Sequence, residues 1–204
     1  MPFKNILVCV DFTDISDAVV NSAALLSKIF DAKINLLTVI ERPVPILHEG
    51  FEELIEPEEI EILFELEKKL REEAEERLNK YAKNLSDKNI KVKTIIEISE
   101  NITDTILDNI EKEKVDLVII GSHKKGLVDK LLLGSISEKI VNKSPVSTLI
   151  IKGKEIKDLK RLLVGYDFLP NSKEALNIAQ EIAKKCNSDI FIVHADTDIK
   201  HTHI

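Results

Sequence analysis

Tryptophan is absent from this 204-residue sequence, aromatic residues make up only 4% of it, and there are just two cysteines. The scarcity of aromatic rings removes the stacking surfaces on which a single-stranded nucleic acid would bind. Cys9 and Cys186 fit neither a metal-type nor a redox-type spacing, so we expect both to be reduced and structural. No run of about 18 apolar residues occurs, which argues against a membrane-spanning helix.

Positive charge is also scarce, because the net charge is −7 and the acids are concentrated in one stretch. Residues 49–80 carry 13 Glu against 5 Lys or Arg, and the remainder is close to neutral. A basic stripe for a phosphate backbone is therefore missing, and we expect no nucleic-acid partner and no membrane partner. Residues 1–5 lead straight into an apolar strand pattern without a small-residue cleavage site, which predicts a cytoplasmic protein.

Short apolar runs alternate with helix-length segments along most of the chain. They lie at 5–10, 33–40, 91–98, 115–120 and 146–151. Runs that are almost continuously apolar are typical of parallel strands covered by helices on both faces. The pattern predicts an α/β fold, a doubly wound five-stranded parallel sheet with the strand order 3-2-1-4-5 and an additional C-terminal βαβ unit.

The longest segment between two of these runs predicts a helix over 58–85, preceded by a loop that contains Pro43, Pro45 and Pro57. The apolar positions step by three or four, namely Leu63, Leu66, Leu70, Ala74, Leu78 and Ala82. Two interpretations stay open. The helix packs one face on the sheet and exposes its Glu-rich face, or it serves as an arm for a partner or for oligomerisation.

An internal repeat relates residues 4–39 to residues 160–195 at a constant offset of 156, with ten of 36 pairs identical. The identical pairs include Asp11 with Asp167 and Phe12 with Phe168. The second copy ends after its second strand and so supplies one βαβ unit. We therefore predict a domain over 1–152, a linker over 153–159 and a partial second repeat over 160–204. His201 and His203 near the chain end offer two imidazoles without a third ligand, and no metal site is expected.

Three of the six glycines, Gly121, Gly126 and Gly134, fall in one 14-residue window between the fourth strand and a helix. A loop that runs from the carboxyl end of a parallel strand to a helix N-terminus presents free backbone N–H groups to an anion. Gly134 would allow the backbone to approach a phosphate closely. Ser135 and Glu138 also have the spacing of a capping box, so the same residues could serve helix capping alone.

Asp11 follows the first strand, which in this strand order is adjacent to the fourth at the point where the winding direction reverses. Ligands of open α/β sheets bind in that crevice. The carboxylate of Asp11 would face the glycine-rich loop and could accept hydrogen bonds from a ribose. In the alternative interpretation Asp11 only organises the turn before the first helix.

The stretch from Gly121 to Ile140 resembles the signature loop of nucleotide-binding universal stress proteins, whose pattern is Gly, two residues, Gly, nine residues, Gly, then Ser or Thr. Gly121, Gly134 and Ser135 match this pattern at the required spacing, whereas Lys124 stands at the position of the middle glycine. The resemblance extends over residues 4–152, and residues 160–196 resemble the opening of a second domain.

The resemblance implies ATP as the ligand, with or without Mg²⁺, and a set of residues around it. The implied contacts are Asp11 at the ribose, Val39 at the base, Ile120, Gly121 and His123 along the loop, and Gly134, Ser135, Ile136 and Ser137 around the phosphates. Lys124 and Gly126, in the same loop, complete the predicted binding site. The Lys124 ammonium could supply a charge contact in place of a backbone contact. His123 lacks an identifiable acidic or nucleophilic partner in the sequence, so no catalytic residue is predicted.

The sequence therefore predicts an ATP-binding regulatory module of the stress response, with slow or absent hydrolysis. It is not expected to be an enzyme beyond a weak ATPase activity. The alternative is a ligand-independent dimer of the same family that acts through its surfaces, with a protein partner that the sequence does not identify. A ligase or pyrophosphatase of related fold is disfavoured, because neither a Ser-Gly-Gly-x-Asp-Ser loop nor a His-x-Gly-His motif occurs.

Overall fold

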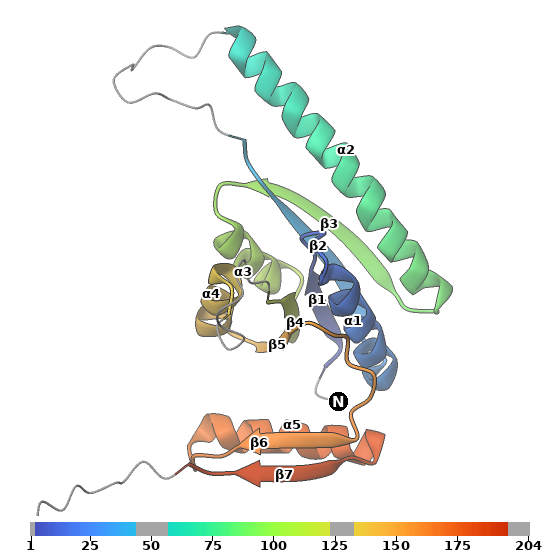
Figure 1. The fold of residues 1–204 in the computed structure, drawn as a ribbon, viewed down its shortest axis with the longest axis vertical. Coiled ribbons are helices and arrows are strands. Elements are labelled where there is room, and N and C mark those ends of the chain that lie inside the picture. The colour runs from blue at the N-terminus through green and yellow to red at the C-terminus, as the bar shows by residue number, and fades with distance from the viewer. Residues whose placement is uncertain (1–2, 44–56, 123–132, 196–204) are drawn as a thin grey trace, which may run out of the picture. The chain divides into compact units, whose positions relative to one another are not determined.

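The structure is a computed structural model that describes residues 3–43, 57–122 and 133–195 (Figure 1). It divides into two compact units, the first over Phe3–Ile156 and the second beginning at Lys157. Among the helices in these described ranges, none is both long enough and apolar enough to cross a membrane.

The first unit alternates strands and helices along the chain. Its elements are β1 (Asn5–Cys9), α1 (Ser16–Phe30), β2 (Lys33–Glu41), α2 (Pro57–Asp87), β3 (Val92–Ser99), α3 (Ile102–Lys112), β4 (Leu117–Gly121), α4 (Ser135–Lys143) and β5 (Ser147–Ile151). The five strands are parallel and lie in the order β3-β2-β1-β4-β5. The predicted fold class and strand order are confirmed, and each predicted strand boundary is within two residues of the observed one.

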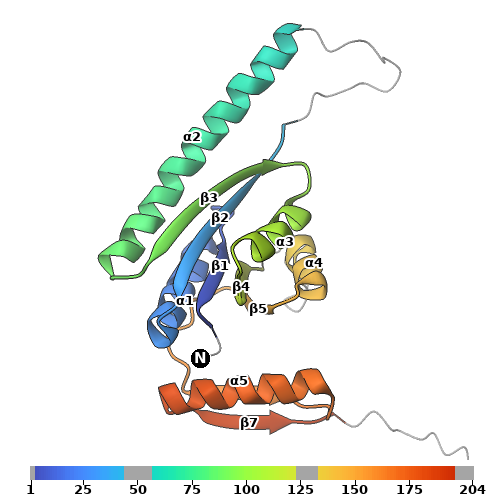
Figure 2. The same ribbon diagram turned by 180° about the vertical axis from the view of Figure 1, so that it is seen from behind.

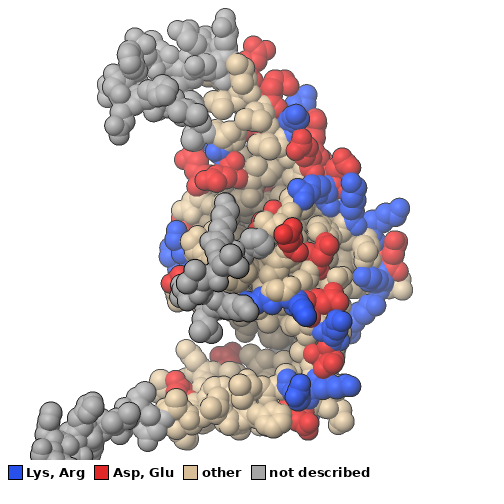
Figure 3. All heavy atoms as spheres, viewed as in Figure 1, with Lys and Arg blue, Asp and Glu red and all other residues tan. Residues whose placement is uncertain are grey.

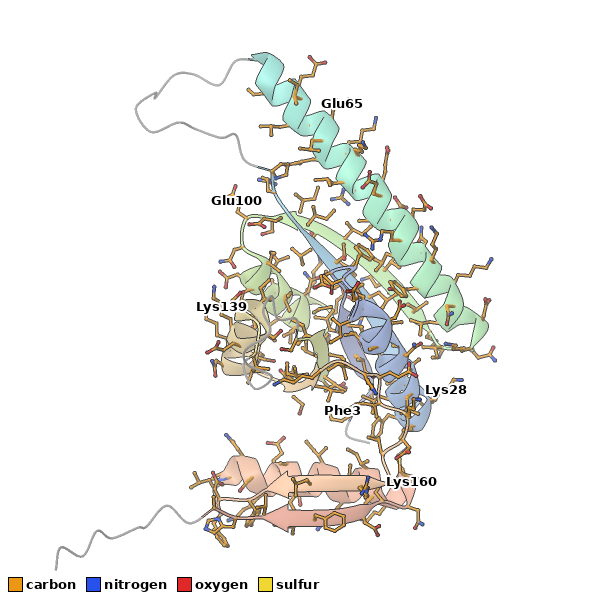
Figure 4. All side chains as sticks on the ribbon, viewed as in Figure 1. Phe3, Lys28, Glu65, Glu100, Lys139 and Lys160 are labelled. Atoms are coloured by element: carbon orange, nitrogen blue, oxygen red, sulfur yellow. The ribbon has the colours of Figure 1, made fainter. Side chains whose placement is uncertain are left out.

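Helices cover both faces of this sheet, α1 and α2 on one and α3 and α4 on the other (Figures 1 and 2). Leu7 of β1 and Leu37 of β2 pack beneath Ile106 and Ile110 of α3 and Ile140 of α4, in one buried apolar cluster. At the opposite face, Phe3, which is labelled in Figure 4, meets Phe30 of α1 edge-on with 5.4 Å between ring centroids. Double coverage explains why the central strands are apolar at almost every position.

Polar groups, of which Asn5 and Asn35 are buried, join the amino-terminal ends of three neighbouring strands. The Asp116 carboxylate accepts hydrogen bonds from the backbone N–H groups of Lys4 at 2.7 Å and Asn5 at 3.0 Å. The amide of Asn35 in β2 donates to the side-chain oxygen of Asn5 in β1 at 2.7 Å. Because a slip of one residue would leave the buried amides of Asn5 and Asn35 unpaired, the network favours the observed register.

The helix α2 buries Ala74, Leu78 and Leu85 and is amphipathic over that half. Its first half instead leaves apolar side chains exposed, namely Ile60, Ile62, Phe64 and Leu66. The outer surface of α2 carries mixed acidic and basic side chains (Figure 3). The packing interpretation therefore holds for the C-terminal half of α2, and the arm interpretation stays a prediction for the first half.

The second unit contains β6 (Arg161–Gly165), α5 (Pro170–Cys186) and β7 (Asp189–Val193), with β6 and β7 parallel. Its backbone repeats that of β1-α1-β2 at the offset of the sequence repeat. Phe12 and Phe168 both have positive φ, 59° and 68°, and Asp31 and Asn187 both end a helix in the left-handed region, at 55° and 52°. The repeated sequence therefore adopts the same local structure twice, while its assignment to a second family domain stays a prediction.

Candidate functional site

A cavity of about 620 Å³ opens at the carboxyl ends of β1 and β4, where the winding direction of the sheet reverses. Asp11 and Thr13 line it after β1, and Gly134 to Ser137 line it at the start of α4. Apolar side chains from the sheet, α1 and α3 form the rest of its wall, namely Ile15, Val19, Leu37, Val39, Ile102, Ile106 and Ile120. The cavity thus combines a large apolar surface with polar groups gathered at two of its edges.

Asp11 organises the turn between β1 and α1 through one carboxylate oxygen. Its Oδ1 accepts hydrogen bonds from the Thr13 backbone N–H at 3.1 Å, the Thr13 hydroxyl at 2.7 Å and the Ser16 hydroxyl at 3.0 Å. Desolvation raises the pKa of Asp11, but these hydrogen bonds outweigh it and hold the pKa below its usual value. Asp11 therefore organises this turn, and its contact with a ribose stays a prediction. Among the described residues, no side chain or backbone group donates a hydrogen bond to Oδ2.

Gly121 ends β4 at the cavity wall, where the side chains of α1 come very close. A Cβ atom at this position would lie 2.7 Å from Cγ2 of Ile15 and 3.2 Å from Cγ2 of Val19. The absence of a side chain thus lets α1 pack against the end of β4. Packing alone is sufficient reason for glycine here, independently of any ligand.

The start of α4 differs from the predicted capping box. Gly134 is the N-cap, in an extended conformation with φ −67° and ψ 154°, and no side chain of the described residues caps the helix. Ser135 is already the first helical residue and is exposed, so the prediction that its hydroxyl caps the helix is wrong. A serine inside the first turn can no longer reach the N–H groups that a residue one position earlier would cap.

Within the described part of the chain, the backbone N–H groups of the first turn of α4 therefore have no side-chain cap, and this turn lines the cavity. Ser137 anchors this turn, because its buried hydroxyl donates to the carbonyl oxygen of Gly121 at 2.8 Å. The bond links the first turn of α4 to the end of β4. It also means that the Ser137 hydroxyl is engaged within the protein.

Cys9 lies in the cavity wall beside Asp11. Burial raises the pKa of its thiol to about 12, with a further contribution from the Asp11 carboxylate. The thiol is therefore protonated at neutral pH and acts as a small apolar group.

Eight of the predicted site residues come together around this one cavity, from four separate segments of the chain. They are Asp11, Val39, Ile120, Gly121, Gly134, Ser135, Ile136 and Ser137. The remaining three, His123, Lys124 and Gly126, lie outside the described residues. For all eleven predicted site residues, contact with a nucleotide stays a prediction.

Sequence reasoning missed Thr13 and most of the apolar wall. The spacing of Asp11 and Thr13 signals an Asx turn and could have identified Thr13. Ile102 and Ile106 stand four residues apart on α3, which indicates burial of one helix face without showing that this face borders a cavity.

The sequence profile described as the Universal stress protein family matches residues 2–152. The chain belongs to the universal stress protein family. The match covers the whole of the β3-β2-β1-β4-β5 sheet and ends before β6, so the family domain coincides with the unit that contains the cavity.

Individual universal stress proteins resemble the chain at moderate identity. Universal stress protein MJ0577 of Methanocaldococcus jannaschii is 34% identical over 90 residues, which are 44% of this chain and 55% of that protein. The aligned region thus spans about half the length of that relative. The solved structure of MJ0577 superposes with a TM-score of 0.60 at 29% identity, over 76% of this chain and 100% of that one.

Two further structures show the fold at lower identity. A universal stress protein from Archaeoglobus fulgidus matches with a TM-score of 0.72 at 24% identity, over 95% of this chain and 68% of its own. UspA from Lactobacillus plantarum matches with a TM-score of 0.61 at 20% identity, over 74% of this chain and 99% of its own. The α/β sheet of the first unit is therefore the fold of the family.

Proposed function

We propose that the chain is a cytoplasmic regulatory module that binds ATP in the cavity between Asp11 and the N-terminus of α4. The observation that carries the proposal is that Asp11 and the start of α4 line the same cavity, at the carboxyl ends of β1 and β4 where the winding direction of the sheet reverses. A carboxylate suits the hydroxyl groups of a ribose, and free N–H groups at a helix start suit phosphate oxygens.

The dimensions and lining of the cavity support a nucleotide. Cavities for small molecules usually span about 300–1,000 Å³, and the observed volume lies within this range. The apolar wall that includes Val39, Ile102 and Ile106 offers a dry surface for a flat base. Oδ2 of Asp11 is the atom that we assign to the ribose, because Oδ1 already accepts three hydrogen bonds from described residues.

The start of α4 would hold the phosphates. Gly134 has no side chain to block an anion, and no described side chain caps the first-turn N–H groups at 135–137. The positive end of the helix dipole adds a favourable field for a polyphosphate. A Mg²⁺ ion, where it accompanies ATP, would neutralise part of the phosphate charge.

A regulatory role with slow or absent turnover fits the chemistry of the wall. Asp11 is the single carboxylate among the described lining residues, and its Oδ1 is committed to the turn. The Cys9 thiol is protonated at neutral pH and is a poor nucleophile. Neither group is arranged to activate a water molecule, so binding would bias conformation or assembly instead of driving hydrolysis.

Nucleotide released from the purified protein tests the proposal. The protein is denatured with acid, and the supernatant is separated by chromatography with adenine-nucleotide standards. We expect ATP, or ADP left by slow hydrolysis, at close to one equivalent per chain. Protein that contains no nucleotide and binds none on addition of ATP and Mg²⁺ would favour the ligand-independent interaction protein.

A further inference from the structure

The second unit carries an apolar sheet face that the rest of that unit does not cover. Leu163 of β6 is 73% exposed, and Phe191 and Val193 of β7 are 53% and 48% exposed. By strand alternation the three side chains lie on one face of the two-stranded sheet. Exposure of several large apolar side chains on one face marks an interaction site.

The internal repeat shows what this face lacks. The counterparts of the three residues in the first unit are Leu7, Asn35 and Leu37, each at most 1% exposed. Leu7 and Leu37 are covered by α3 and α4. The described part of the second unit has only α5, the counterpart of α1, which leaves the face corresponding to the α3–α4 side open.

Charge at one end of this face is self-complementary. Arg161 and Asp189 begin β6 and β7, are paired in the sheet register, and share the face of Leu163 and Phe191 by alternation. Arg161, Leu163 and Phe191 together line a hollow of about 560 Å³. Figure 3 shows the surface over β6 and β7 as largely uncharged, with the basic side chains and several acidic ones at the end where the strands begin.

We propose that this face binds the same face of a second copy of the chain. A twofold axis parallel to the strands would place β6 over the partner's β7, with Leu163, Phe191 and Val193 packed between the sheets. The same axis brings Arg161 opposite the partner's Asp189, and Asp189 opposite the partner's Arg161. The arrangement is isologous and closed, which limits association to a dimer, and face-to-face sheets pack in this aligned manner.

The small size of the interface sets the strength of the association. Two short strands per partner form a small interface, and interfaces below about 1,200 Å² in total are weak. We therefore expect a reversible dimer with a dissociation constant in the range of roughly 10–100 μM.

Charge exchange between two chains tests the proposal. The variant Arg161→Asp carries two acids at the charged end, and Asp189→Arg carries two bases. Each should weaken self-association of the full chain by about 10-fold, because like charges would face each other across the interface. An equimolar mixture of the two variants should dimerise again, because every contact between unlike chains is then complementary. Sedimentation velocity over a concentration series measures the association of wild type, of each variant alone and of the mixture. In the mixture one variant is fluorescently labelled.

The mixture separates an interface between chains from a contact within one chain. Arg161 and Asp189 are also neighbours within each sheet, so either substitution alone also changes a contact within one chain. Rescue in the mixture can arise only between molecules, because the two substitutions are then on different chains. Circular dichroism verifies that both variants remain folded. The proposal is overturned if wild-type protein stays monomeric at all concentrations, if the single variants dimerise like wild type, or if the mixture fails to restore association. Hydrogen-exchange protection of β6 and β7 in a monomer would show instead that another part of the same chain covers the face.

Discussion

Arg77 of α2 lies over the ring of Phe12, with its guanidinium carbon 4.3 Å from the ring centroid, and donates a hydrogen bond to the Phe12 carbonyl oxygen at 2.9 Å. Phe12 has φ 59°, a conformation that is strained for a bulky residue. One turn further along α2, the Tyr81 hydroxyl donates to Asp17 of α1 at 2.6 Å. The helix α2 therefore holds the β1–α1 turn at the residue next to Asp11.

Replacement of Arg77 should loosen this turn and weaken nucleotide binding. Arg77→Met keeps the aliphatic length but loses the hydrogen bond and the cation–π contact, which together stabilise the turn by about 1 kcal/mol. We expect a roughly 5-fold rise in the dissociation constant for ATP, measured by calorimetry. Arg71→Met, on the same helix but bonded to Ile96 in β3, is the matched control and should bind like wild type. Equal effects of the two substitutions would mean that α2 acts only through general stability.

The Asp11 carboxylate should contribute pH-dependent stability. Its pKa is lower in the folded protein than its unfolded value of about 3.9, so folding favours the charged form. The contribution is complete above the unfolded pKa and is lost as the pH falls through the lower folded pKa. Asp11→Asn should thus lower the free energy of unfolding by about 1 kcal/mol at neutral pH and by progressively less in acid. Urea unfolding at a series of pH values checks this, with Asp14→Asn in the same turn as the control. A deficit that stays constant down to the lowest pH would contradict the assignment.

Gly121 should tolerate no side chain, for reasons of packing. The Cβ of Gly121→Ala would lie within 2.7 Å of the Ile15 side chain, so we expect a destabilisation of about 1–3 kcal/mol. Gly165→Ala is the matched control, because a Cβ there meets nothing within 4 Å. Chemical denaturation measures the free energy of unfolding of the unit that carries each substitution, and it should fall for Gly121→Ala but not for Gly165→Ala. Similar stability of Gly121→Ala and wild type would show that α1 can move away from β4 at little cost.

The raised pKa of Cys9 predicts a thiol that is inert while the protein is folded. A pKa of about 12 leaves very little thiolate at neutral pH. We expect iodoacetamide to modify Cys9 roughly 100-fold more slowly in the native protein than in the denatured protein. Peptide mass spectrometry at timed intervals measures the rate at Cys9 separately from that at Cys186. Equal rates in the native and denatured states would place Cys9 in an open, solvated part of the cavity.

The sequence was sufficient for the sheet and for most residues at the polar edges of the cavity, because both depend on local pattern. Continuous apolar runs located the strands, and Asp11, Gly121 and Gly134 stood out by their positions at strand and helix ends. The packing of Gly121 on Ile15 could not be predicted, because it joins segments more than 100 residues apart along the chain. The same limit applied to Arg77, whose partner Phe12 belongs to a different element.

The start of α4 shows a subtler limit. Ser135 and Glu138 have the spacing of a capping box, yet the helix begins one residue earlier than that motif requires, with Gly134 as the N-cap. Which residue becomes the N-cap depends on the direction from which the preceding chain arrives. Local spacing does not determine that direction.

Titration of the nucleotide-free protein with ATP in the calorimeter, for wild type and Gly134→Val, tests the central claim most directly. Gly134 has an extended conformation that valine can adopt, so the fold should persist while the new side chain blocks the phosphates at the start of α4. We predict one ATP per wild-type chain, because Asp167 in the second unit has no partner loop within the described residues of that unit, and a loss of more than about 2 kcal/mol in the variant. Equal affinity of a folded Gly134→Val, or two equivalent sites per chain, would contradict a nucleotide site between Asp11 and α4.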